Sequence, residues 1–139
     1  MVKSTTMVSF TEKQEQIARV RQQVVEGYPQ LWRRILAEWR QDGSEDRAWL
    51  IYSANYLLRS GNIRWAVDPI SLRWRIPEAP EMDAAADLQG LSFVILTHSH
   101  KDHLDYDLLG RLSDQPIWWV VPDFMVDQVS KKARLPLER

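Results

Sequence analysis

The first forty residues carry apolar side chains at helical spacing. Over residues 12–26 the apolar positions 17, 20 and 24 lie three or four apart, which predicts an amphipathic helix that starts at a capping box of Thr11 and Gln14. Pro29 suits the first turn of a second helix, which the turn residues 41–44 end. The apolar face of that second helix holds five large residues: Leu31, Trp32, Ile35, Leu36 and Trp39. We expect this face to be core, although a Trp-rich face also suits a ligand groove or a partner surface.

From residue 48 the hydrophobic pattern shortens to strands and brief helices. Segments 48–52, 56–59 and 63–67 read as strands, and the last two are predicted to pair antiparallel across a Ser-Gly-Asn turn. Residues 93–96 read as a buried strand, and 117–121 is a near-continuous apolar run, typical of a sheet covered on both faces. Helices are predicted over 82–89, 107–112 and 123–133. The sequence therefore predicts an α/β protein.

Composition and charge narrow the class of protein. The chain has 139 residues, of which 45% are hydrophobic, so it can form a packed core and is not disordered. A net charge of −1 and a sequence pI of about 6.3 offer no basic field for nucleic acid. The absence of cysteine excludes disulfides and thiolate zinc sites. No apolar run is long enough for a signal peptide or a membrane span, so we predict a soluble, cytoplasmic protein.

All three histidines of the chain fall in residues 97–105, directly after the predicted strand 93–96. Together with the carboxylates of Asp102 and Asp105 they offer ligands for a divalent metal, either zinc or else iron or manganese. Unpaired histidines this close together would repel one another when charged. A metal site therefore explains the cluster better than the alternative, a polar loop with solvated histidines.

The spacing of these side chains indicates two metal positions. His98 and His100 are two apart in extended chain, so both side chains leave on the same side and can bind one ion. Asp102 and His103 follow where a helix is expected to start, and they can face a second ion beside the first. Two ions placed in this way clamp a hydroxide between them and hold the substrate oxygen opposite.

The arrangement His98-x-His100-x-Asp102-His103 after an apolar strand resembles the signature of the metallo-β-lactamase-fold hydrolases. That resemblance implies that His98 and His100 bind one metal ion and that Asp102 and His103 bind the other. The expected cofactor is one or two zinc ions, with iron or manganese as alternatives.

Neighbouring positions refine the resemblance. Leu104-Asp105 is similar to the branch with phosphodiesterase- and lactonase-like members, and Lys101, which stands where many members have glycine, is expected to point to solvent. In the family, a hairpin like the one predicted over 56–67 ends in an aspartate that supports the metal loop. By that match Asp68 orients the site without ligating. The alternative is that an aspartate before proline only opens a turn.

The resemblance covers the first half of the family's fold. It implies that residues 47–139 form the N-terminal half of a metallo-β-lactamase αββα sandwich, preceded by a helical extension of two helices in residues 1–46. The family's second half supplies a further histidine, a bridging aspartate and a last histidine, whereas no histidine follows His103 here. We therefore expect a fragment or one piece of a split protein, which associates with itself or binds a partner that carries the missing half.

The expected function is that of a metal-dependent hydrolase. By the resemblance, metal-bound water attacks a small-molecule ester, lactone or phosphodiester, and Asp102 is the catalytic residue expected to guide the proton. With half of the ligands missing, we expect weak activity or none from this chain alone. The alternative function is a non-catalytic module that binds metal, or binds a partner through the Trp-rich helices. The loop 71–80 either covers the site or is a surface connection.

Overall fold

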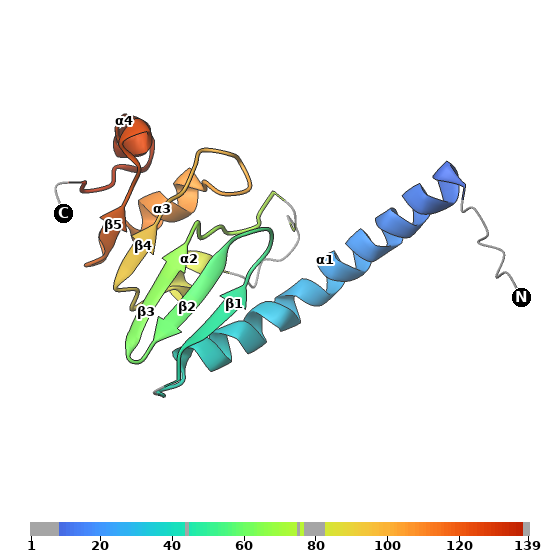
Figure 1. Cartoon of the computed structure of the whole chain (residues 1–139), viewed down its shortest axis with the longest axis horizontal. Helices are drawn as coiled ribbons and strands as arrows, with labels where there is room; N and C mark the ends of the chain where they lie inside the picture. The colour runs from blue at the N-terminus through green and yellow to red at the C-terminus, as the bar shows by residue number, and fades with distance from the viewer. Residues whose placement is uncertain (1–8, 44, 75, 77–82, 138–139) are drawn as a thin grey trace, which may run out of the picture.

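The computed structural model describes residues 9–43, 45–74, 76 and 83–137. Within these ranges the chain is a mixed α/β protein with four helices and one five-stranded sheet (Figure 1), which confirms the predicted class. None of these helices combines the length and the apolar composition needed to cross a membrane. The elements in chain order are α1 (Phe10–Arg40), β1 (Arg47–Leu50), β2 (Tyr56–Ser60), β3 (Ile63–Val67), α2 (Ala84–Asp87), β4 (Phe93–Ile95), α3 (Tyr106–Leu112), β5 (Trp118–Val120) and α4 (Asp123–Ala133).

The five strands lie side by side in the order in which they occur in the chain. β1, β2 and β3 pair antiparallel, and the predicted β2–β3 hairpin is confirmed, whereas β3, β4 and β5 pair in parallel. α2 lies in the crossover from β3 to β4, and α3 lies in the crossover from β4 to β5. Neighbouring parallel strands end at the same edge of a sheet, so the residues that follow β3, β4 and β5 are brought together there.

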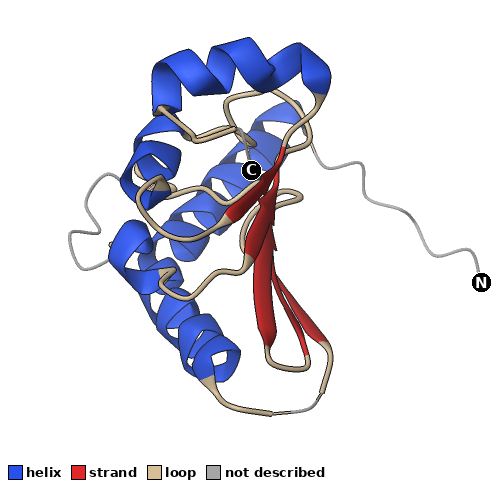
Figure 2. Ribbon diagram, turned by 90° about the vertical axis from the view of Figure 1, so that its left-hand side faces the viewer, coloured by secondary structure: helices blue, strands red, loops and turns tan. Residues whose placement is uncertain are grey.

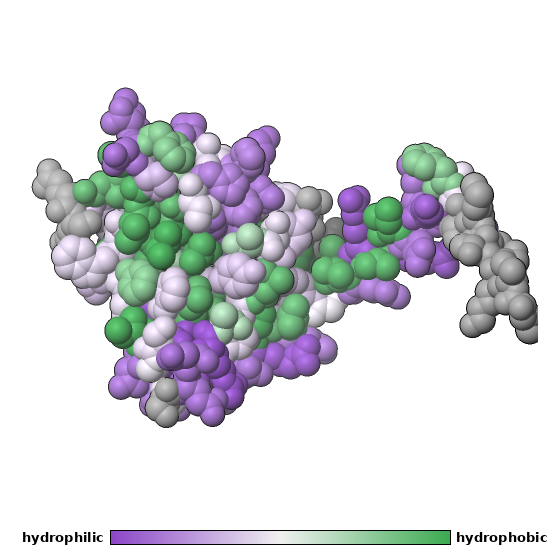
Figure 3. Space-filling model, viewed as in Figure 1, coloured by the Kyte–Doolittle hydropathy of each residue, from purple (hydrophilic) through white to green (hydrophobic). Residues whose placement is uncertain are grey.

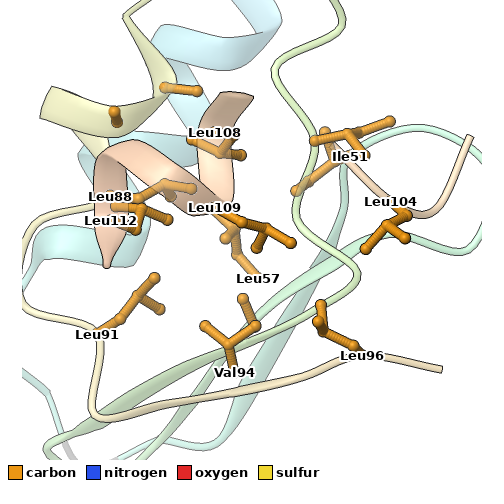
Figure 4. Close-up of a cluster of buried hydrophobic side chains, with 14 of the residues drawn as sticks. Ile51, Leu57, Leu88, Leu91, Val94, Leu96, Leu104, Leu108, Leu109 and Leu112 are labelled. Carbon is orange, nitrogen blue, oxygen red and sulfur yellow. The ribbon is translucent and has the colours of Figure 1, made fainter. Parts of the chain in front are cut away.

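The helices lie on one side of the sheet, and the core lies between the two layers (Figure 2). Leu57 and Val94 face Leu108, Leu109 and Leu112 of α3 (Figure 4), and none of the five is more than 1% exposed. Burial of an aliphatic side chain of this size contributes roughly 1.5–3 kcal/mol. The core therefore holds β4 and α3 firmly in place, and the histidine-rich loop runs between these two elements.

The first helix corrects the prediction of two helices. α1 continues through Pro29, and it begins behind a capping box of Ser9 and Glu12, not of Thr11 and Gln14. The Glu12 carboxylate accepts a hydrogen bond from the backbone N–H of Ser9, and this bond lowers the pKa of Glu12. Proline in a helix interior removes a backbone hydrogen bond and costs about 3 kcal/mol, so contacts elsewhere must hold the helix together at this point.

α1 stays helical across Pro29 because the rest of the protein holds it on either side of the proline. Tyr28 donates a hydrogen bond from its hydroxyl to the backbone oxygen of Ile51 (2.8 Å), and Trp32 donates one from Nε1 to a carboxylate oxygen of Asp87 (2.8 Å). Of the five residues predicted to be core on this half of α1, four are buried and Leu31 is 37% exposed; the buried four are Trp32, Ile35, Leu36 and Trp39. These two tryptophans are therefore packed inside the protein and offer no surface to a partner.

The other face of the sheet is apolar and carries none of the described helices. Cross-strand pairing places its residues in two rows that cross all five strands: Ala48, Leu58, Trp65, Phe93 and Trp118 in one, and Leu50, Tyr56, Val67, Ile95 and Val120 in the other. Trp118 is 63% exposed, and apolar side chains gather over this face (Figure 3). In the described part of the chain only Trp119 of β5 faces the helices, so the apolar run 117–121 is covered on one face of the sheet and exposed on the other.

Candidate metal centre

The histidine-rich loop lies at the sheet edge where the parallel strands β3 and β4 end. Beyond the strand ends, the backbone N–H of Asp68 donates to the oxygen of Ile95 and that of Leu96 donates to the oxygen of Val120, both at 2.9 Å. The hydrogen-bonded ladder therefore continues up to the start of the loop. It places Asp68, the first residue after β3, directly beside residues 97–103.

The carboxylate of Asp68 is buried against this loop, with the residue only 1% exposed. It accepts hydrogen bonds from the backbone N–H of Thr97 (2.7 Å) and from the Thr97 hydroxyl, and one of its oxygens lies 2.9 Å from Nδ1 of His103. The Asp68 backbone is left-handed, with φ of 45°, a conformation that aspartate and asparagine tolerate better than most residues. This sharp bend ends β3.

Asp68 decides which nitrogen of His103 carries the hydrogen. An ionised carboxylate only accepts hydrogen bonds, so Nδ1 of His103 must donate to Asp68. In the neutral imidazole that a metal requires, the lone pair then lies on Nε2. Nε2 of His103 lies 3.7 Å from a carboxylate oxygen of Asp102, so these two candidate ligand atoms are close together.

Thr97 extends the same control to His98. The Thr97 hydroxyl donates its only hydrogen to Asp68, so it can only accept from Nδ1 of His98, which lies 2.8 Å away. The lone pair of a neutral His98 ring is thereby also placed on Nε2. One buried carboxylate thus sets both tautomers, directly for His103 and through a hydroxyl for His98.

The structure brings part of the predicted ligand set together: His98 and His103 form a group with Asp68, whereas His100 and Asp102 lie nearby and are not members of that group. The ring centroid of His98 lies 4.0 Å from that of His103 and 4.6 Å from that of His100. The backbone oxygen of His100 accepts hydrogen bonds from the N–H groups of His103 and Leu104, both at 2.9 Å, so a tight turn carries Asp102 back toward the histidines. His103 is buried, His98 and Asp102 are half-buried, and His100 is exposed.

Among the described residues, the group whose ligand atoms come close enough to hold one ion includes Asp68. Asp68, His98 and His103 each offer a ligand atom, and these three atoms lie within 4.8 Å of one another, close enough to hold one ion. Asp68 would then be a ligand, whereas the sequence predicts that it only orients one. Three hydrogen bonds already engage its two oxygens, which favours the orienting role.

The sequence predicts that the carboxylates of both Asp102 and Asp105 offer metal ligands, but the hydrogen bonds of Asp105 give it a different role. One of its oxygens accepts a hydrogen bond from the N–H of Leu108 (3.0 Å) and so caps the N-terminus of α3. Loss of such a cap lowers stability by about 1 kcal/mol. The other accepts from the N–H (2.8 Å) and the hydroxyl of Ser71. Both oxygens are engaged in ordering the loop, so the role that the hydrogen bonds support for Asp105 is to fix where α3 begins.

Two residues that order the candidate site escape sequence reasoning. Thr97 precedes the histidines, but nothing in its position indicates that it links Asp68 to His98. Asn55 is fully buried, and its side-chain amide donates to the backbone oxygens of Asp68 and of Asp102, both at 2.8 Å. It ties the end of β3 to the histidine-rich loop 97–103 across a sequence separation of 47 residues, and no local pattern marks it.

A cleft of about 870 Å³ lies beside the histidine-rich loop 97–103. Ser99 and Lys101 of the loop form one wall, and Arg73 and Trp74 belong to the segment 71–80, of which residues 75 and 77–80 lie outside the described ranges. Lys101 is exposed, as expected, and it borders this cleft. Arg73 is paired with Asp107 at 3.4 Å. The described part of the predicted loop therefore lies beside the site and contributes to its surface.

The chain was compared with protein-family models and with curated proteins. No family model matches the chain, and no curated protein matches it. The resemblance to the metallo-β-lactamase family therefore rests on four residues, His98, His100, Asp102 and His103, and on their place after β4. It stays a prediction.

Proposed function

We propose that the loop 97–103 binds a divalent metal ion as part of a hydrolytic centre. The observation that carries this proposal is the buried hydrogen bond between Asp68 and Nδ1 of His103, which leaves Nε2 facing Asp102 with His98 alongside. A histidine ligand commonly donates its other nitrogen to a carboxylate in this way. Imidazole and carboxylate donors suit zinc first, and also iron or manganese.

The proposed reaction is hydrolysis of a small-molecule ester, lactone or phosphodiester. A bound zinc ion would supply a water molecule whose pKa is lowered toward neutrality. Asp102, whose carboxylate lies 3.7 Å from Nε2 of His103, is both a proposed ligand and the residue proposed to hold and pass the proton. Lys101 and Lys132 border the adjoining cleft, where a cation balances a negative charge that develops on the substrate.

A complete hydrolase of this kind would need a second layer. The uncovered apolar face of the sheet, with Trp118 and Val120 more than half exposed, supports a second β-layer packed on it. Such a layer would be the source of the further ligands that the resemblance implies. Without them we propose low affinity for metal and little turnover.

Metal binding is the first test. Purified chain should bind zinc in a calorimetric titration, and cobalt(II) in its place should give the visible absorption of a low-coordinate histidine site. A His98→Ala/His100→Ala double variant should lose most of both signals, and a Ser99→Ala variant should keep them. Equal metal content in the double variant and the parent would refute the assignment.

The apolar sheet face also favours a second function, that of a non-catalytic interaction module. In that case the face itself binds the partner and the metal loop only stabilises the strand ends. Trp118→Lys/Val120→Lys should then abolish partner binding, and removal of the histidines should leave it intact. The hydrolase proposal would be favoured if substrate hydrolysis appeared when a partner is added and was lost in the His100→Ala variant.

A further inference from the structure

The first half of α1 extends beyond the body of the protein (Figure 1). Every residue from Phe10 to Val24 is exposed, and the buried residues of this helix begin at Tyr28. We call residues 10–27 the arm. A helical segment of this length is only marginally stable in water by itself. An arm of this kind gains stability when a second element covers its apolar side chains.

The apolar side chains of the arm follow a heptad repeat. Phe10, Ile17, Val24 and Leu31 recur every seventh residue, and Val20 lies three residues after Ile17. Each of the five is at least 37% exposed. Apolar residues that repeat every 3.5 positions on average form the contact stripe of a left-handed coiled coil. The helix that covers this stripe should therefore run alongside the arm.

The remaining positions of the repeat identify the kind of partner. In heptad notation the four residues from Phe10 to Leu31 occupy position a, and position d holds Lys13, Val20 and Gly27. The flanking e and g positions of the arm are nearly uncharged: Gln14, Gln16, Arg21 and Gln23. Glu12, Glu15 and Glu26 fall at positions that point away from the stripe. An identical copy therefore meets no row of like charges at this surface.

We propose that two copies of this chain associate through their arms as an antiparallel coiled coil. In this register Ile17 of one copy packs on Val20 of the other, Lys13 lies against Val24, and Phe10 lies opposite Gly27. There is open space where Gly27 would carry a Cβ, so the largest side chain of the stripe meets the smallest. A parallel pair would instead place Lys13 against Lys13 and Gly27 against Gly27, which combines charge repulsion with a packing gap.

A groove at the base of the arm accommodates the tip of the second arm. Its volume is about 370 Å³, and its walls include Val24 and Tyr28 of α1 together with Tyr52, Leu72 and Ile76 of the body. Val24 and Tyr28 flank Gly27 along the helix, so Phe10 of the second copy reaches the edge of this groove. Phe10 is 76% exposed in the single chain, and the antiparallel pair covers it in both copies.

The mass of the full chain in solution tests the association. Light scattering after gel filtration should give the mass of two chains for the parent and of one chain for Ile17→Glu, with circular dichroism confirming that the body stays folded. Ala18→Glu introduces the same charge one residue away, off the stripe, and should remain a dimer. A parent that is monomeric throughout a concentration series overturns the proposal. So does a dimer that survives Ile17→Glu and separates in Trp118→Lys, because the sheet face would then be the interface.

Single cysteines test the orientation, since the chain has none of its own. A mixture of Lys13→Cys and Val24→Cys chains should form a disulfide-linked heterodimer on mild oxidation, and neither variant alone should. In the antiparallel pair two copies of residue 13 lie about 16 Å apart along the axis, from the helical rise of about 1.5 Å per residue. Efficient self-linking of Lys13→Cys overturns the antiparallel arrangement in favour of a parallel one.

Discussion

Asp68→Asn separates the role of Asp68 in setting tautomers from its role in stability. Asparagine has almost the same shape and suits the left-handed backbone at this position, where φ is 45°. Its amide oxygen can still accept from the backbone N–H of Thr97. Its NH₂ group, however, takes the place of the oxygen that lies 2.9 Å from Nδ1 of His103. That nitrogen must then accept a hydrogen bond, which moves the imidazole hydrogen to Nε2 and blocks ligation there.

The magnitudes for this variant follow from the contacts. A hydrogen bond to a charged group contributes about 1.5–3 kcal/mol and a neutral one about 0.5–1.5, so weakening two or three of them should cost roughly 1–4 kcal/mol of unfolding free energy. The midpoint temperature should fall by about 4 °C for each kcal/mol in a domain of this size. Zinc affinity should fall by about 10–100-fold, the usual effect of losing the hydrogen-bond partner of a metal ligand.

Three measurements test this prediction together. Competition with a chromophoric chelator gives the zinc affinity, thermal unfolding of the metal-free protein gives the stability, and long-range proton–nitrogen NMR gives the tautomers of His98 and His103 directly. Asp105→Asn is the matched control, because this carboxylate also accepts from a backbone N–H and a hydroxyl but serves Ser71 and α3. It should lose stability and keep zinc affinity. An Asp68→Asn protein with the parent's zinc affinity would refute the tautomer reasoning.

Further outcomes follow from the same structure. Asp68→Ala should weaken zinc binding less than His103→Ala in a parallel titration, because one orients a ligand and the other removes it; equal losses would make Asp68 a ligand. The isolated chain should not hydrolyse phosphodiester, lactone or β-lactam substrates above metal-in-buffer controls, and activity that His100→Ala abolishes would contradict this. Pro29→Ala restores a helical N–H, so it should raise the unfolding free energy by up to about 3 kcal/mol and raise the midpoint of thermal unfolding with it; an unchanged midpoint would show that the proline costs nothing here.

The sequence was most informative where the structure is local. The segment from His98 to His103 is contiguous, so its place between a buried strand and a helix could be predicted from neighbouring residues alone. The Pro29 boundary was wrong because contacts of Tyr28 and Trp32 with distant residues outweigh a local helix breaker. The link through Thr97 and the bridging amide of Asn55 could not be predicted, because hydrogen bonds between distant segments leave no periodic signal.

The consecutive order of the five strands bears on how the chain folds as it is synthesised. Each strand pairs with the one made just before it, so the sheet can grow in one direction without waiting for a distant segment. The histidine-rich loop 97–103 can reach its final conformation only after a longer stretch of chain has been synthesised. Its hydrogen bonds span 35 residues from Asp68 to His103 and 47 from Asn55 to Asp102. The apolar face of the sheet stays uncovered in the described part of the folded chain, so it is exposed to other chains both during and after synthesis. Aggregation at high expression should therefore decrease when Trp118 is replaced by lysine.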